Sequence, residues 1–328
     1  MTVSVPKSNV PRASVLIAAR DVGPYIECAV RSALSQTLAD IEVIVVDDAS
    51  TDDTYARVQG IHDSRLRLFR TDGGGWARAR NSVMAEAQGR YLAFLDGDDE
   101  WLPHHLECLV DYLDHRPGLD LAFAASRWIG EKGEPLPRTV VRFAGPITYE
   151  HMFVEFPPIT ASALCARADA VKAVGGFDEI LPTGADSDLC LRVMKLRPFN
   201  CAGIPEVGLR YRRRVGQVTA NCHRKAAGWE RLLEKHQAID PVAMRRWGSV
   251  ARANHRRAWA AIAYENGAFA EARLWMARAL HESPLSLARD RRSWITGAAV
   301  ASSILPPAWR KSVEHAGITW LRRLHRDG

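Results

Sequence analysis

Three carboxylates lie within four residues of this sequence, at Asp96, Asp98 and Asp99. They follow the apolar run Tyr91–Leu95, which has the composition of a buried strand. Carboxylates this close repel one another, and Mg²⁺ is typically bound by one or two carboxylates together with substrate phosphates. Asp and Gly are also the ordinary residues of a solvated turn. The tetrapeptide at 96–99 therefore predicts either a metal–diphosphate site or a plain turn before the next helix.

Two further acidic positions stand at the ends of predicted elements. Asp47 and Asp48 follow an apolar, β-branched run, and Asp186 stands at the start of a predicted helix. Asp48 could accept hydrogen bonds from a base or a ribose, whereas Ser50 and the Asp residues around it could equally cap the next helix. Asp186 could act as a general base toward an acceptor hydroxyl, or could only favour the positive end of its helix.

Two basic stretches could hold phosphate. Gly73–Gly75 precede a predicted helix that contains Arg80, and Tyr211 precedes three arginines that end at Arg214. Helix N-termini and guanidinium groups both bind phosphate well. The glycine pattern is neither GxGxxG nor GxxxxGK[ST], so it does not indicate a Rossmann dehydrogenase or a P-loop NTPase. The arginine run could clamp a diphosphate or could simply be a solvated strand end.

Alternating strand-like and helix-like segments in the first hundred residues would position these side chains. We expect strands at 14–19, 41–46, 66–69 and 91–95, and helices at 24–34, from about 50 to 60, and at 76–87. This alternation predicts an α/β fold with a mostly parallel central sheet. Ligands bind at the carboxyl ends of parallel strands. We therefore expect 47–48 and 96–99 to meet at one edge.

The remainder of the chain divides into two parts. A strand is expected at 119–124, loops and short strands at 130–160, and helices at 168–174 and 186–196. Residues 217–328 hold 19 Lys and Arg and 9 Asp and Glu, a net charge of +10, whereas residues 1–216 carry −4. We predict an extension at 1–12, a ligand-binding α/β domain at 13–216 and a basic α-helical region at 217–328.

Composition narrows the class of protein. The hydrophobic content of 47% and charged content of 25% are those of a globular chain. Six cysteines are scattered without a CxxC pair, which favours a reducing compartment and argues against a structural zinc site. Residues 1–12 lack the apolar core of a signal peptide, and the longest apolar run, 294–305, is too short to span a bilayer. We expect a cytoplasmic location.

The basic C-terminal region contains two notable patterns. Residues 251–283 predict a helical hairpin with a bend at Asn266-Gly267, spaced like one tetratricopeptide-type unit. The tail from Trp309 to Leu324 is basic and amphipathic, which is typical of a helix lying on an anionic membrane and also of a solvated helix face. The region has no recognised nucleic-acid motif, and we expect no nucleic-acid partner.

Taken together and in order, the motifs resemble those of the family 2 glycosyltransferases with the GT-A fold. The resemblance covers about residues 13–220 and includes, after the first strand pair, GGGWARARN, YLAFLDGDD, VGGFDE, GADSDLCLR and YRRRVGQVT. It implies a GT-A nucleotide-sugar-binding domain followed by the helical region. It also implies nucleotide-sugar contacts at the following positions: Ala18, Ala19, Asp48, Arg80, Asp96 and Arg214.

The resemblance further implies the chemistry of the site. Asp98, with Asp96, would bind Mn²⁺ or Mg²⁺, and Asp186 would be the general base of an inverting transfer. Asp99 would either orient the acceptor or support the metal-binding residues from the neighbouring shell, and Trp101 could lie on the acceptor side. The donor would be a nucleoside-diphosphate sugar, with UDP expected, and the acceptor a hydroxyl of a glycan or a lipid-linked glycan.

The sequence departs from the family pattern at Arg214, where the family often has His, so a guanidinium–diphosphate contact is expected there. Two alternative functions remain open. One is a non-catalytic protein that binds nucleotide sugars. The other is a phosphotransfer enzyme that uses Asp96 and Asp98, although Glu100 stands where its DxDx[TV] pattern needs Thr or Val.

Overall fold

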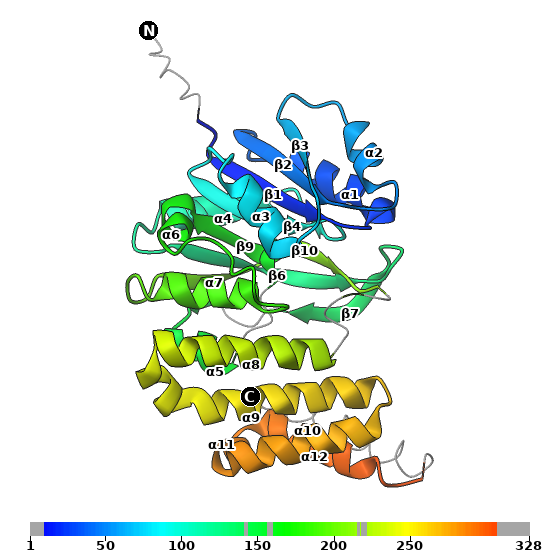
Figure 1. Ribbon diagram of the computed structural model, residues 1–328, viewed down its shortest axis with the longest axis vertical. Coiled ribbons are helices and arrows are strands. Elements are labelled where there is room, and N and C mark those ends of the chain that lie inside the picture. Colours follow the sequence, from blue (N-terminus) through cyan, green and yellow to red (C-terminus); the bar gives the residue numbers. More distant parts are fainter. Residues whose placement is uncertain (1–9, 141–143, 156–159, 215–216, 218–221, 307–328) are drawn as a thin grey trace. The chain divides into compact units, whose positions relative to one another are not determined.

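The computed structural model describes residues 10–140, 144–155, 160–214, 217 and 222–306. The chain forms two compact units, one comprising 1–152 and 157–217 and the other comprising 153–156 and 218–328. Figure 1 labels the elements of both. The tail at 309–324, for which the sequence suggested a membrane-binding helix, lies outside the described residues.

A single mixed sheet forms the centre of the first unit. Its strands lie in the order β3-β2-β1-β4-β9-β6-β10-β5, with β7 paired to β6 and β8 paired to β10. The strand bounds are β1 Ala13–Ala19, β2 Ile41–Asp48, β3 Leu66–Thr71, β4 Tyr91–Asp96, β5 Glu100–Trp101, β6 Leu121–Ile129, β7 Pro135–Val140, β8 Gly145–Pro146, β9 Leu164–Arg167 and β10 Cys201–Arg212. Strands β3, β2, β1 and β4 are parallel, and β6 and β10 are parallel too. The predicted α/β class with its central parallel strands is confirmed.

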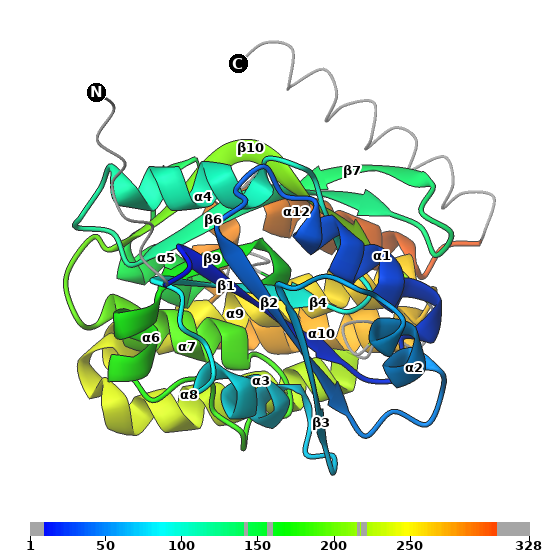
Figure 2. The same ribbon diagram turned by 90° about the horizontal axis from the view of Figure 1, so that it is seen from above.

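Helices cover both faces of this sheet. Their bounds are α1 Gly23–Leu34, α2 Thr54–Gln59, α3 Trp76–Met84, α4 His105–Asp114, α5 Tyr149–Glu155, α6 Ala168–Ala173 and α7 Ala185–Met194. Helices α1 and α4 lie on one face, and α3, α6 and α7 lie on the other (Figure 2). Buried side chains of α1 and α4 form one core cluster with inward residues of β1, β2 and β4, which fixes the strand ends.

The strand register places the acidic residues at one edge of the sheet, as predicted. Ala19 at the end of β1 is opposite Asp47 of β2, and Ala18 is opposite Asp96 of β4. The apolar residues of β2 are buried almost without interruption, as expected for a parallel strand covered on both faces. The two acidic strand ends therefore flank the end of β1.

Several elements differ from the sequence-based expectation. Strands β9 and β10 were not predicted, and helix α5 lies within 130–160, where loops and short strands were expected. Ser50 does not cap α2: its Oγ accepts from the backbone N–H of Asp21, and α2 begins only at Thr54. The helix expected at 76–87 ends at Met84.

The second unit is helical. Its helices are α8 Cys222–Ile239, α9 Pro241–Glu265, α10 Phe269–Glu282, α11 Pro284–Arg289 and α12 Arg291–Ser302. The predicted bend is confirmed: α9 and α10 form a hairpin, and Gly267 takes a φ of 76° that a side-chain-bearing residue rarely adopts. Across the hairpin the rings of Trp259 and Trp275 meet edge to face at 5.0 Å. Within the described residues, no helix combines the length and apolarity that crossing a membrane requires.

Candidate active site

The acidic turn leaves β4 with Asp96 as its last residue. The backbone N–H of Asp96 donates to Ser162 Oγ at 3.0 Å, and its carboxylate forms an ion pair with Arg80. With 37% of its side chain exposed, Asp96 is the open member of the acidic run. The next residue, Gly97, has no room for a side chain, because a Cβ there would lie 2.9 Å from Val22.

Arg80, which pairs with Asp96, packs against two aromatic rings. Its guanidinium lies 4.8 Å from the ring centroid of Trp76 and 5.5 Å from that of Phe177, and the side chain is 98% buried. Asn81 fixes the segment that carries Phe177, because it donates to the Phe177 carbonyl and accepts from the Phe177 N–H. Arg80 therefore holds a buried positive charge against Asp96 in a defined orientation.

Asp98 lies deeper and pairs with a different arginine. Its Oδ2 accepts from Arg214 Nε at 2.6 Å, and the Arg214 guanidinium lies 5.7 Å from the ring of Tyr25. Burial raises the pKa of Asp98, and the charge of Asp96 raises it further, against the opposing effect of Arg214. Asp98 is thus a desolvated carboxylate with one exchangeable cationic partner.

Asp99 and Trp101 are interior residues, and the position of Asp99 agrees with the expectation of a supporting role rather than direct contact with an acceptor. Both carboxylate oxygens of Asp99 are occupied, one by Ser162 Oγ at 2.6 Å and the other by the Arg212 N–H at 2.8 Å. Trp101 is 4% exposed and donates from Nε1 to the Ser162 carbonyl. Burial, followed by the charges of Asp98 and Asp96, raises the pKa of Asp99 well above its usual value. Both side chains support the turn from behind.

Asp48 is held by fixed donors. Its Oδ1 accepts from Thr71 Oγ1 and its Oδ2 from the Gly75 N–H, both at 2.8 Å, while Arg20 lies 3.7 Å away. Gly75 has a φ of 90°, so this contact depends on a glycine. Ala49, the next residue after Asp48, has a φ of 57°, a strained conformation that often marks a functional loop.

Ala18 and Ala19, at the end of β1, lie between the two acidic strand ends. The Ala18 carbonyl accepts from the Gly97 N–H at 3.3 Å. The Ala19 Cβ lies 3.3 Å from the position that a Cβ would occupy at Gly97. The end of β1 is therefore packed directly against the acidic turn.

Asp186 begins helix α7 and is electrostatically coupled to the acidic turn. The Ser187 N–H donates to its Oδ1 at 2.9 Å. Burial raises the pKa of Asp186, and the charge of Asp96 raises it too, while Ser187 and Arg80 lower it. A carboxylate with a raised pKa is suited to general base catalysis near neutral pH. The structure thus brings Asp186 into the electrostatic environment of Arg80 and Asp96.

The chemistry of the donor set fits a divalent cation. Asp96 and Asp98 supply hard oxygen ligands, and their mutual repulsion is a cost that a cation would relieve. No group of three or more acidic, His or Cys side chains gathers as a metal cage in the described part of the chain. Mg²⁺ and Mn²⁺ sites built on one or two carboxylates need substrate phosphates to complete them, which agrees with this sparse set.

Sequence reasoning missed two supporting residues. Ser162 bonds to Asp96, Asp99 and Trp101 from a segment for which no element was predicted. Arg212 donates to the Asp98 carbonyl from its side chain, and to Asp99 from its backbone. The run Tyr211–Arg214 was the available signal for Arg212, but nothing in the pattern around Ser162 pointed to its position.

Comparison with known proteins shows which family model part of the chain matches. Residues 14–167 match the model of Glycosyl transferase family 2. The UDP-Glc:alpha-D-GlcNAc-diphosphoundecaprenol beta-1,3-glucosyltransferase WfaP of Escherichia coli is 41% identical over 102 residues, which are 31% of this chain and 41% of that protein. Two glycosyltransferases of Rickettsia are matched over 32% of their length. The chain spans less than half the length of these curated relatives.

Two solved structures share the fold. TarS 1–349 of S. aureus, in complex with UDP-GlcNAc, has a TM-score of 0.59 at 16% identity, covering 97% of this chain and 92% of that one. The mannosyltransferase PcManGT of Pyrobaculum calidifontis, in complex with GDP-Man and Mn²⁺, has a TM-score of 0.60 at 19% identity, covering 94% and 84%. The expected resemblance to family 2 and the GT-A fold are both confirmed: residues 14–167 match the family model, and the chain shares the fold of these two structures.

Proposed function

We propose that this protein is an inverting, metal-dependent glycosyltransferase that moves a sugar from a nucleoside-diphosphate donor to a hydroxyl of a glycan or a lipid-linked glycan. The observation that carries the proposal is the ion pair of Asp96, at the end of β4, with Arg80, together with the electrostatic interaction of both with Asp186 in the first turn of α7. A displacement reaction needs both a proton acceptor and residues that bind the diphosphate, whereas simple nucleotide binding needs no proton acceptor.

Donor recognition follows from the two acidic strand ends. Asp48 and the backbone of Ala18 and Ala19 would contact the base and ribose. Thr71 and Gly75 already hold the Asp48 carboxylate in one orientation for this contact. UDP is the proposed nucleotide: the Escherichia coli relative is named for UDP-Glc, and TarS was solved with UDP-GlcNAc.

Phosphate recognition would use the exchangeable charges. Asp98, with Asp96, would hold Mn²⁺ or Mg²⁺, which when bound would stabilise negative charge on the diphosphate leaving group. Arg214 is paired with Asp98 before the donor arrives, and its guanidinium would then turn to a phosphate oxygen. Arg80 would keep Asp96 oriented throughout.

The transfer itself needs one proton acceptor. The acceptor hydroxyl attacks the anomeric carbon from the face opposite the diphosphate, the bond to the diphosphate oxygen breaks, and Asp186 takes the hydroxyl proton. One displacement inverts the anomeric configuration and requires no covalent intermediate. The raised pKa of Asp186 makes it a stronger base than an ordinary carboxylate.

The substitution Asp186→Asn tests this assignment. We expect transfer from UDP-sugars to fall by about 10³-fold, on the order found for loss of a key catalytic group, while Mn²⁺-dependent UDP binding stays within twofold. Asp188→Asn is unsuitable as a control because Asp188 pairs with Arg192. Asp169→Asn serves instead, because Asp169 is exposed and, like Asp186, accepts from the N–H of the next residue. Turnover of the Asp186 variant close to that of the wild type would refute the base. UDP-sugar binding with neither transfer nor donor hydrolysis in the wild type would favour a non-catalytic binding protein.

We also propose that the protein associates peripherally with an anionic membrane through its basic helical unit, where a lipid-linked acceptor would be found. The unit exposes large apolar side chains at Leu285, Trp294 and Ile304 beside its many arginines. Flotation with vesicles containing phosphatidylglycerol would compare the full chain with a chain that lacks 285–328 and hence these three side chains. Equal flotation of the two would refute a membrane role for 285–328.

A further inference from the structure

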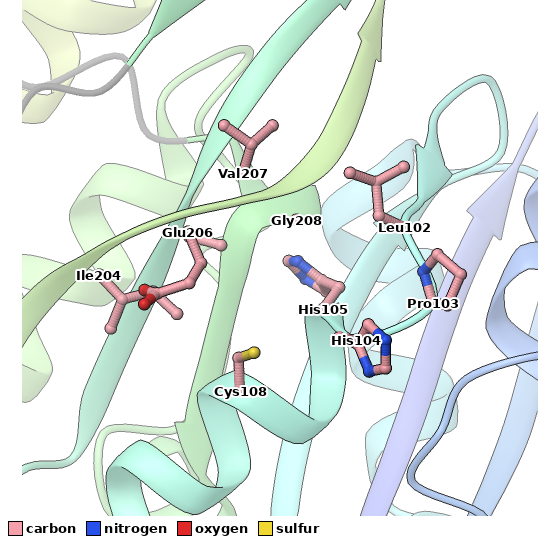
Figure 3. A pocket seen from close by; sticks show the side chains of 10 residues that line it. Leu102, Pro103, His104, His105, Cys108, Ile204, Glu206, Val207 and Gly208 are labelled. Carbon is pink, nitrogen blue, oxygen red and sulfur yellow. The ribbon is translucent and has the colours of Figure 1, made fainter.

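A cavity of about 520 Å³ opens between helix α4 and strand β10, away from the carboxylates of the acidic edge. Its apolar lining comes from Leu102, Pro103, Ala124, Ile204 and Val207. Figure 3 shows His105 and Cys108 projecting from α4 toward β10, with Glu206 nearby. Its volume lies in the range of cavities that bind small organic molecules.

A bulge in β10 creates this cavity. Gly203 pairs with Phe123 and Val207 pairs with Ala125, so residues 204–206 stand opposite the single residue Ala124. The extra residues of β10 have no pairing partner on β6, and the small side chain of Ala124 leaves space beside them. Bulges of this kind commonly occur beside functional sites.

His105 is the unexplained polar group of the cavity. The side chain is 98% buried, and neither ring nitrogen has a hydrogen-bond partner. Its ring lies against the backbone of Gly208, where a Cβ would come within 2.2 Å of Nδ1. An unpaired buried imidazole costs stability that a phenyl ring of similar size would not. The residue type is therefore poorly explained by packing alone.

The electrostatics of the cavity select the class of ligand. Burial lowers the pKa of His105 to about 3, so the ring is neutral and carries one N–H and one lone pair. The surrounding atoms shield both ring nitrogens, so the ring must turn toward the cavity before a ligand can pair with it. After burial, the charges of Glu206, Glu107 and Asp111 raise the pKa of the Cys108 thiol, which shows a negative field at the rim. An anionic ligand is disfavoured there, whereas a hydroxyl group can both donate to and accept from the imidazole.

We propose that this cavity is a second binding site, distinct from the donor site, for a small uncharged amphiphile whose apolar body fills the cavity and whose hydroxyl group pairs with His105. The occupied site would act on the acidic turn. The His105 ring lies 4.5 Å from that of Trp101, which bonds to the Ser162 carbonyl, and Ser162 Oγ bonds to Asp99. This second part rests on the proposed function.

Alkylation of Cys108 tests the site without any assay of sugar transfer. The full-length protein is treated with iodoacetamide, with and without 1-octanol, and modification is followed peptide by peptide. We expect 1-octanol to slow alkylation of the half-exposed Cys108 at least fivefold and saturably, while the exposed Cys28 is unaffected. Octanoate, with the same chain and a charged head, should protect at least tenfold more weakly. Absence of protection by 1-octanol would overturn the proposal, and equal protection by octanoate would overturn the ligand class.

Two variants decide the role of the cavity and of His105. His105→Phe should raise the 1-octanol concentration for half-protection about fivefold, and Ala124→Leu, which fills the floor, should abolish protection. His115→Phe, at the residue that follows the same helix and outside the cavity, is the control. Full protection in both His105→Phe and Ala124→Leu would overturn the site, and it would be measurable even if one variant folded poorly.

Coupling to the donor site is measured separately. In the wild type, 1-octanol should change the affinity for UDP in the presence of Mn²⁺ by at least threefold, and the His105→Phe variant should lose this response. Protection of Cys108 with no change in UDP affinity would overturn the coupling. If the protein does not bind UDP at all, the proposed function fails, and the Cys108 experiment still decides the second site.

Discussion

The segment 96–105 places polar groups on two sides, and the two sides differ in how those groups are paired. At the sheet edge Asp96 and Asp98 each have an arginine partner, Arg80 and Arg214. On the cavity side His105 has no hydrogen-bond partner. A charge with a movable partner can exchange that partner for a ligand, whereas an unpaired neutral group can only gain one. The first arrangement suits a cation and diphosphate, and the second suits an uncharged molecule.

Loss of Asp98 is expected to have the largest effect. Asp98→Ala removes the buried carboxylate that is proposed to bind the metal and leaves Arg214 without its partner. We expect sugar transfer to fall by about 10³-fold and Mn²⁺-dependent UDP binding to be lost, measured by calorimetry with and without Mn²⁺. Asp40→Ala, at an exposed carboxylate, is the control. Unchanged Mn²⁺-dependent binding in Asp98→Ala would contradict the idea that this side of the segment binds the cation.

Arg214 tests whether its pairing is exchangeable. Arg214→Met should raise the KM for the UDP-sugar by about 10- to 100-fold, since a charge-assisted hydrogen bond to phosphate is worth roughly 1.5–3 kcal/mol. Arg214→Lys should recover part of the loss, because lysine keeps the charge without the planar fork. The neighbouring Arg213 lies over Trp128, so Arg213→Met is the matched control. Equal KM values for the two methionine variants would show that Arg214 does not contact the bound donor and only pairs with Asp98 in the protein without donor.

The sequence allowed more of the site to be predicted than of the scaffold around it. Asp48, Asp96 and Asp98 follow strongly apolar runs, so strand ends at one edge could be predicted from periodicity alone. Strand β10 could not, because Pro205, Glu206 and two glycines break its pattern at the bulge. The burial of Trp101 depends on Ser162, 61 residues away, and local pattern does not encode such a contact.

Asp48 provides the contrast of a carboxylate with fixed partners. Asp48→Ala would leave the Gly75 N–H and the Thr71 hydroxyl without their acceptor and should lower the free energy of unfolding by about 1–3 kcal/mol. Asp48→Asn should lose less, because the Thr71 hydroxyl can rotate and accept from the new amide. Urea unfolding at constant pH measures both. The exposed Asp53→Asn, which breaks only a surface pair with Arg57, should change stability by less than about 0.5 kcal/mol.

His105 gives the smallest effect and isolates the unpaired side of the segment. Its pKa is lowered to about 3 in the fold, from about 6.5 in the unfolded chain, so only the unfolded chain takes up this proton between those values. Stability is therefore fully present above pH 6.5 and falls as the pH decreases toward 3. The slope from this one group approaches about 1.4 kcal/mol per pH unit.

His105→Phe should remove that slope while leaving the protein at least as stable at pH 7.5. Urea unfolding of wild type and variant at pH 7.5, 5.5 and 4.5 measures it. The buried His255, whose pKa is also lowered to about 3, contributes equally in both proteins and cancels in the difference. Parallel stability curves would mean that His105 gains a proton in the fold, and hence that it already has a partner. The contrast between the paired carboxylates Asp96 and Asp98 and an unpaired His105 would then not hold.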